Sequence, residues 1–168
     1  MEEYPMSIEE LKSSLLAAPK NGYARISAEE RAEMEAYCKR YMAFMDAAKT
    51  ERESTAWAVA EAEKRGFVPF VSGMDAKPGD KIYYNNRGKA IALAVIGTEP
   101  LNKGANICAA HVDSPRMDLK PNPLYEDSEI AYFKTHYYGG IKKYQWPTVP
   151  LALHGVVCCK DGRTVNVT

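Results

Sequence analysis

The sequence contains no long apolar run and no excess of charge of either sign. No segment approaches the roughly 20 consecutive apolar residues that a membrane-spanning helix needs, and the first residues lack the basic and apolar stretches of an export signal. Lys plus Arg total 22 and Asp plus Glu total 22, with the two signs interspersed along the chain. We therefore expect a cytoplasmic protein with no membrane partner and no nucleic-acid partner.

Cysteine is scarce, and its spacing excludes a simple thiolate metal site. The four cysteines include no Cys-x-x-Cys pair. Adjacent residues of a strand point to opposite faces, so Cys158 and Cys159 could not share one metal ion. We expect all four, Cys38, Cys108, Cys158 and Cys159, to be reduced structural thiols, as is usual in a cytosol.

The first half of the chain carries the signals of two helices. Ser27 with Glu30, and Thr50 with Glu53, have the spacing of capping boxes, in which each side chain accepts a hydrogen bond from the other residue's backbone N–H. The helices that these boxes begin are predicted over residues 28–48 and 51–65. Apolar residues at spacings of three and four predict a buried stripe on the first helix: Met34, Tyr37, Cys38, Tyr41, Met42, Met45 and Ala48.

After residue 67 the pattern changes to short extended runs separated by turn residues. Residues 81–84 and 89–96 predict a β-hairpin, and residues 105–111 are typical of a strand buried on both faces of a sheet. An all-β unit is predicted to begin near residue 120, with Pro121 and Pro123 in a turn. Beyond Pro115, extended segments are expected at residues 117–120, 130–138, 150–159 and 163–168. The last segment ends without a closing turn, and we expect that a longer protein has been cut there.

The segment Ala-Ala-His-Val-Asp-Ser-Pro at residues 109–115 requires a chemical explanation. Residues two apart on an extended chain point the same way, so Asp113 can accept a hydrogen bond from one ring nitrogen of His111 and leave the other for a metal ion. The carboxyl end of a buried strand is also where open α/β sheets place their sites. Spacing alone leaves open an ordinary salt-bridged or helix-capping pair. A three-histidine zinc site with His136 and His154 is conceivable, but no short ligand spacing supports it, and structural histidines are preferred.

From about residue 11 onward the chain resembles the aspartyl aminopeptidase family of two-zinc exopeptidases, in its bacterial form. The likeness rests on residues 50–53, on Ala-His-Val-Asp-Ser-Pro at residues 110–115 and on Lys-Thr-His-Tyr-Tyr-Gly-Gly at residues 134–140. The resemblance implies that His111 is a zinc ligand and that Asp113 orients it as part of the catalytic site. It also implies that the other ligands and a catalytic Glu come from later sequence.

The resemblance further implies a fold and an activity. The expected α/β fold has helices followed by a mixed sheet, with residues 1–119 forming part of a catalytic domain and residues 120–168 beginning an inserted β-rich oligomerisation domain. The expected enzyme is a homo-oligomer with two zinc ions, or cobalt or manganese, that removes N-terminal residues from peptides. The chain alone should then be inactive. The competing hypothesis is a non-catalytic structural or assembly unit in which His111 binds no metal.

Overall fold

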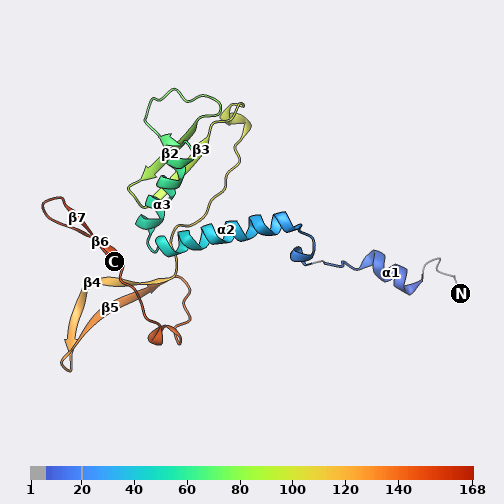
Figure 1. Ribbon diagram of the computed structural model, residues 1–168. Helices are drawn as coiled ribbons and strands as arrows, with labels where there is room; N and C mark the ends of the chain where they lie inside the picture. The colour runs from blue at the N-terminus through green and yellow to red at the C-terminus, as the bar shows by residue number, and fades with distance from the viewer. Residues whose placement is uncertain (1–6, 20) are drawn as a thin grey trace. The chain divides into compact units, whose positions relative to one another are not determined.

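The computed structural model describes residues 7–19 and 21–168 (Figure 1). The chain divides into two compact units, Met1–Ala43 and Phe44–Thr168, which are described separately. Among the described residues, none of the helices has the combination of length and apolar character needed to cross a membrane.

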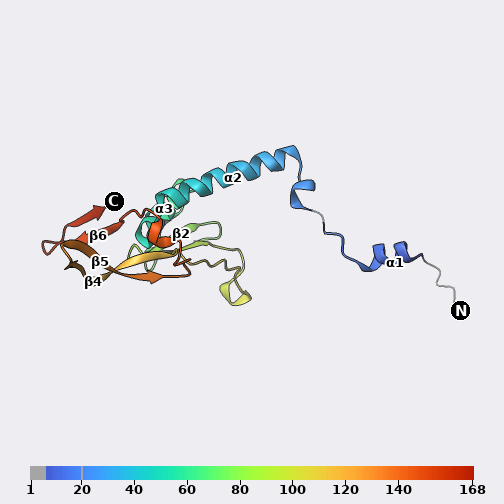
Figure 2. The same cartoon turned by 90° about the horizontal axis from the view of Figure 1, so that it is seen from below.

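The first unit is helical. Helix α1 (Ile8–Leu15) begins at a capping box in which Glu10 N–H donates to Ser7 Oγ at 3.2 Å. The box predicted between Ser27 and Glu30 is confirmed, with donor–acceptor distances of 2.8 and 3.1 Å. It precedes α2 (Ala28–Ala47), which is one continuous helix in both views (Figure 1, Figure 2). The last turn of α2, from Phe44 onward, belongs to the second unit.

The predicted burial of the apolar stripe on α2 is wrong for the described chain. Helix α2 has no buried residue, and of the predicted stripe only Ala48, just beyond its end, is buried. Tyr37, Met42 and Met45 are 62%, 63% and 41% exposed. The periodicity correctly predicts the helix, but burial of its apolar face also requires a packing partner, which the periodicity does not supply.

In the second unit, α3 (Glu51–Lys64) packs against a mixed three-stranded sheet (Figure 1). Strand β1 (Val68–Pro69) is parallel to β2 (Lys81–Asn86), which is antiparallel to β3 (Ala90–Val95). The predicted helix and hairpin are both confirmed, whereas the two-residue β1 was not predicted. Tyr83 of β2 is buried, and its hydroxyl donates to Glu63 Oε1 of α3 at 2.8 Å, which joins helix to sheet.

Strands β4 (Arg116–Asp127) and β5 (Ile130–Tyr138) form a separate hairpin. The prediction that Pro121 and Pro123 form a turn is wrong, because both lie inside β4. Pairing shifts between Leu119 and Leu124, so the two prolines, which have no N–H to donate, occupy an irregular stretch of the ladder. β4 also runs without interruption across residues 119 and 120, where the domain boundary was predicted; that boundary stays a prediction.

The predicted strand at residues 105–111 is also wrong. This stretch has no regular secondary structure, and all of its residues are exposed, because no neighbouring strand pairs with it. The extended segment predicted at residues 150–159 is regular only in β6 (Gly155–Cys158), which pairs with β7 (Thr164–Val167). Short 3-10 turns cover Gly22–Ala24, Leu101–Lys103 and Trp146–Thr148.

Candidate functional site

His111 and Asp113 lie on the irregular segment that leads into β4. His111 Nδ1 is 2.7 Å from the backbone oxygen of Asp113 and 3.3 Å from its carboxylate oxygen Oδ1. Both atoms are acceptors, so Nδ1 carries the ring hydrogen and Nε2 keeps its lone pair; the tautomer follows from these partners. The His111 side chain is 78% exposed and that of Asp113 30%. Nε2 is therefore available to a metal ion or to another electrophile.

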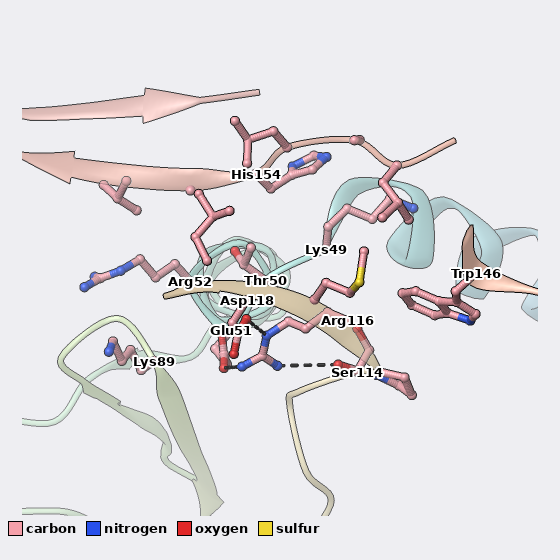
Figure 3. A pocket seen from close by; sticks show the side chains of 18 of the residues that line it. Lys49, Thr50, Glu51, Arg52, Lys89, Ser114, Arg116, Asp118, Trp146 and His154 are labelled. Atoms are coloured by element: carbon pink, nitrogen blue, oxygen red, sulfur yellow. Dashed lines mark hydrogen bonds and ion pairs between the residues drawn. The ribbon is translucent and has the colours of Figure 1, made fainter. Parts of the chain in front are cut away.

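The residues after Asp113 are held by a cluster of side chains centred on Arg116, which we call the Arg116 cluster (Figure 3). Arg116 Nη2 donates to Glu51 Oε1 at 2.9 Å, and Nε donates to Asp118 Oδ1 at 2.7 Å. Nη1 makes a longer contact, 3.4 Å, with the backbone oxygen of Ser114. The guanidinium carbon lies 4.4 Å from the ring centroid of Tyr138, which is the register partner of Arg116 on β5. These contacts connect the first turn of α3, both strands of the hairpin and the segment that carries Asp113.

A glycine completes the support on the other side of that segment. Gly139, the residue after β5, has φ 73°, and a Cβ placed there would lie 3.3 Å from Pro115 Cα and 3.4 Å from Pro115 Cγ. Only glycine combines this left-handed backbone with so close an approach. The turn at Ser114–Pro115 is therefore contacted by both Arg116 and Gly139.

A family model described as aminopeptidase I zinc metalloprotease (M18) matches residues 44–168. The chain belongs to the M18 aminopeptidase family. The resemblance to the zinc aminopeptidases is thus confirmed at the level of the family. His111, Asp113 and the Arg116 cluster all lie within the matched part of this M18 chain.

Proteins from three bacteria are similar to this chain, and two of them are solved structures. The probable M18 family aminopeptidase 1 of Clostridium acetobutylicum is 47% identical over 161 residues, which make up 94% of this chain and 35% of that protein. The crystal structure of aminopeptidase I from Borrelia burgdorferi B31 is 42% identical with a TM-score of 0.83, covering 88% of this chain and 37% of that one. The structure of an M18 aminopeptidase from Thermotoga maritima is 45% identical with a TM-score of 0.78, covering 90% and 33%. The α/β fold class is confirmed, and this M18 chain spans about a third of the length of these relatives.

The zinc that the family description names can be compared with the donors present. His111 suits one position of a zinc site, because a neutral imidazole with Nδ1–H held by an acceptor coordinates through Nε2. Across residues 7–19 and 21–168, no group of three or more His, Cys, Asp or Glu side chains is placed to hold a metal ion. The described donors therefore fit one ligand and its orienting residue.

The other two histidines do not join His111 in a cluster, so the three-histidine site is not formed. His136 stacks on Tyr137 with ring centroids 5.5 Å apart. His154 Nδ1 lies 2.9 Å from Glu53 Oε1, beside a cavity of about 610 Å³ that Arg116 and Trp146 also line (Figure 3). His154 thus pairs with the carboxylate that caps α3, and its role as a structural histidine stays a prediction.

Glu53 has a lowered pKa. Burial alone would raise it, but the hydrogen bond with His154, those from the Lys49 and Thr50 amides, and the charge of His154 together outweigh burial. The pKa therefore lies below the usual 4.5. This carboxylate is the capping-box residue of α3, so the same group begins the helix and holds the segment before β6.

Sequence reasoning missed the Arg116 cluster. The spacing of Arg116 and Asp118 places both side chains on one face of a strand, which was a usable signal for their ion pair. The contact with Glu51 had no such signal, because 65 positions separate the two residues and only the folded chain brings them together.

Proposed function

We propose that the longer polypeptide containing this chain is a zinc-dependent aminopeptidase that removes N-terminal residues from peptides. The observation that carries the proposal is the pairing of His111 Nδ1 with Asp113, which leaves Nε2 exposed on a chain of the M18 family. In this proposal Nε2 of His111 binds one of two metal ions, with cobalt or manganese as alternatives to zinc.

The roles of the chain's own residues follow from that contact. Asp113 keeps the hydrogen on Nδ1, fixes the ring's direction and makes Nε2 a better donor. Zinc, when bound, supplies a Lewis acid that activates water near neutral pH and polarises the scissile carbonyl. The remaining ligands and the Glu that carries the proton are assigned to sequence outside this chain.

Cytoplasmic location, homo-oligomerisation and the lack of nucleic-acid or membrane partners are part of the same proposal. Equal numbers of acidic and basic residues support the absence of polyanion partners. The two-stranded sheets β4–β5 and β6–β7 present edges and large exposed apolar side chains, among them Leu124, Phe133 and Val157. Such edges are usually covered in a native assembly, which supports contact with another copy.

The competing function is a structural or assembly unit in which His111 binds no metal. It is favoured by the same exposed edges and by the single well-placed donor within the described ranges. The two functions differ in one measurable property, the metal content that depends on His111.

The test changes His111 to Ala in the longer polypeptide. We expect loss of one tightly bound metal ion per subunit, measured by mass spectrometry of the dialysed protein, and loss of nearly all hydrolysis of aminoacyl amides. His136→Ala is the matched control, because His136 is exposed and its ring stacks on that of Tyr137; this variant should keep both properties. Wild-type metal content and turnover in His111→Ala would show that His111 binds no metal ion. A longer polypeptide with neither tightly bound metal nor turnover would establish the assembly function instead.

A further inference from the structure

We propose that Arg116 is a positioning residue: it holds the Ser114–Pro115 turn against the first turn of α3 and thereby sets the direction in which His111 presents Nε2. The proposal rests on the proposed function, since it concerns the support of the proposed ligand. Arg116 itself is placed in contact with no reacting atom.

The first argument is the number of directions from which Arg116 is restrained. Its three nitrogens each face a different acceptor: the Glu51 carboxylate on α3, the Asp118 carboxylate on β4 and the Ser114 carbonyl. The ring of Tyr138 on β5 covers the face of the guanidinium. The side chain is only 24% exposed. A planar fork with its donors in fixed directions can be satisfied this way only in one orientation.

The second argument is how short the path is from Arg116 to His111. Ser114, whose carbonyl faces Arg116 Nη1, is the neighbour of Asp113, and the backbone oxygen of Asp113 lies 2.7 Å from His111 Nδ1. Rotation of the backbone near Ser114 would therefore move both oxygens of Asp113 that face the imidazole. Residues 105–111 pair with no strand of the described chain. No regular secondary structure therefore holds His111 from its N-terminal side within the described residues. Within the described chain, the contacts that restrain this segment lie on its C-terminal side, in the Arg116 cluster.

The third argument is charge. Burial would lower the pKa of Arg116, but the hydrogen bond that Arg116 donates to Asp118 and the charges of Glu51, Asp118 and Asp113 together raise it. One guanidinium thus balances carboxylates from three segments. Removing it would leave Glu51 and Asp118 without their shared cation and would free the Asp113 segment to move away from them.

The experiment compares Arg116→Lys and Arg116→Met with Arg163→Lys in the longer polypeptide. Arg163 is the matched control, because its Nε donates to Asp161 at 2.7 Å, as Arg116 Nε does to Asp118, but on the β6–β7 turn. Zinc affinity is measured by competition with a chelator, and kcat and KM are measured separately, all at a temperature well below unfolding. We expect a loss of about 10- to 100-fold in zinc affinity for both Arg116 variants, the range typical of residues that orient a ligand. The loss should appear in kcat rather than KM, and Arg163→Lys should match the wild type.

A purely structural role would lower the unfolding temperature and leave the zinc affinity of the folded protein unchanged, which would overturn the proposal. If an Arg116 variant does not fold, Glu51→Gln replaces it; this change keeps the shape and weakens one arm of the cluster. It should give a smaller loss of zinc affinity, and wild-type affinity would count against the proposal. His111→Ala distinguishes failure of the proposed function from failure of the positioning role. If His111→Ala keeps its metal ion, the proposed function fails. If His111→Ala loses the metal ion and Arg116→Lys keeps wild-type zinc affinity, only the positioning role of Arg116 fails.

Discussion

Around His111, single residues are held by their neighbours along the chain. Asp113 offers His111 two acceptors, a backbone oxygen and a carboxylate oxygen, and only the second depends on the residue type. The backbone contact should survive substitution of the side chain. The role of the carboxylate is therefore to add charge to a contact that the backbone already makes.

Changing Asp113 to Asn in the longer polypeptide tests the value of that charge. The amide keeps an acceptor for Nδ1–H but removes the negative charge that strengthens Nε2 as a donor. We expect metal affinity and activity to fall by about 10- to 100-fold, less than for His111→Ala. A metal titration of peptidase activity measures this. Asp161→Asn, at a carboxylate paired with Arg163, is the control. If Asp113→Asn and Asp161→Asn had equal activity at every metal concentration, Asp113 would have no role in orienting His111.

Gly139→Ala tests the contact with Pro115. Gly73 has a similar positive φ, 84°, but a Cβ there would meet nothing within 4 Å. Gly73→Ala should therefore lower the free energy of unfolding by about 1–2 kcal/mol, the cost of placing a residue with a Cβ in the left-handed backbone conformation. Gly139→Ala adds the 3.3 Å approach to the Pro115 backbone and should be more destabilising. Urea denaturation of both variants gives the difference, and equal losses would show that the contact at Pro115 relaxes freely.

Among the elements, α3 carries carboxylates that contact two other parts of the chain, the segment before β6 and Arg116 of β4. Its capping-box residue Glu53 accepts hydrogen bonds from the Lys49 and Thr50 amides at 2.9 Å each and pairs with His154 at 2.9 Å. The first residue of the helix, Glu51, belongs to the Arg116 cluster. The start of one helix is thus connected to β4 and to the segment before β6.

The lowered pKa of Glu53 gives a pH dependence for this element. A carboxylate whose folded pKa is depressed contributes stability that is present above the unfolded value and lost as pH falls through the folded value. The difference in free energy of unfolding between wild type and Glu53→Gln should be about 1–2 kcal/mol at neutral pH and shrink below pH 4.5. Urea denaturation from pH 7 to 3 measures it. Glu30→Gln is the control: its capping box includes no histidine, so it should lower the free energy of unfolding by less. If the difference between wild type and Glu53→Gln grew as the pH fell, the lowered pKa assigned to Glu53 would be wrong.

The elements that sequence could predict are those with local causes. Capping boxes placed α2 and α3, and short extended runs separated by turn residues placed β2, β3 and β5. Three predictions failed because each depended on another part of the structure. Residues 105–111 would need a neighbouring strand to pair with, and the stripe on α2 would need a packing partner to bury it. The prolines lie inside β4 because the pairing with β5 shifts there. At the site, the proximity of His111 and Asp113 follows from spacing, whereas Glu51 and Tyr138 reach Arg116 only through tertiary structure.

For the whole molecule, the small core is the main physical fact. The described residues that are buried number five, Ala48, Ser54, Thr55, Ala62 and Tyr83, and nearly all of them belong to α3 or its contacts with the sheet. A domain of about 150 residues ordinarily buries close to 70% of its unfolded surface. Large side chains such as Leu101 and Ile107 are instead 81% and 84% exposed.

We expect the 168-residue chain alone to be catalytically silent, and the reason is the number of ligands. One histidine with an orienting carboxylate leaves a divalent ion mostly hydrated, so its affinity should be far below that of a site with four protein donors. The purified chain should not hydrolyse a panel of aminoacyl amides in excess zinc, cobalt or manganese, with the longer polypeptide as the positive control. Metal-dependent turnover that His111→Ala abolishes would show that the missing donors lie within these residues.

The order of the strands has a consequence for how fast the chain acquires structure. Every sheet pairs strands that follow one another in sequence, β1-β2-β3, β4-β5 and β6-β7. Pairing of this kind closes short loops, and an isolated hairpin forms in about 1–10 μs. Each hairpin can therefore search for its register without waiting for distant segments, and the time needed to fold is set by the long-range contacts such as Glu51 with Arg116.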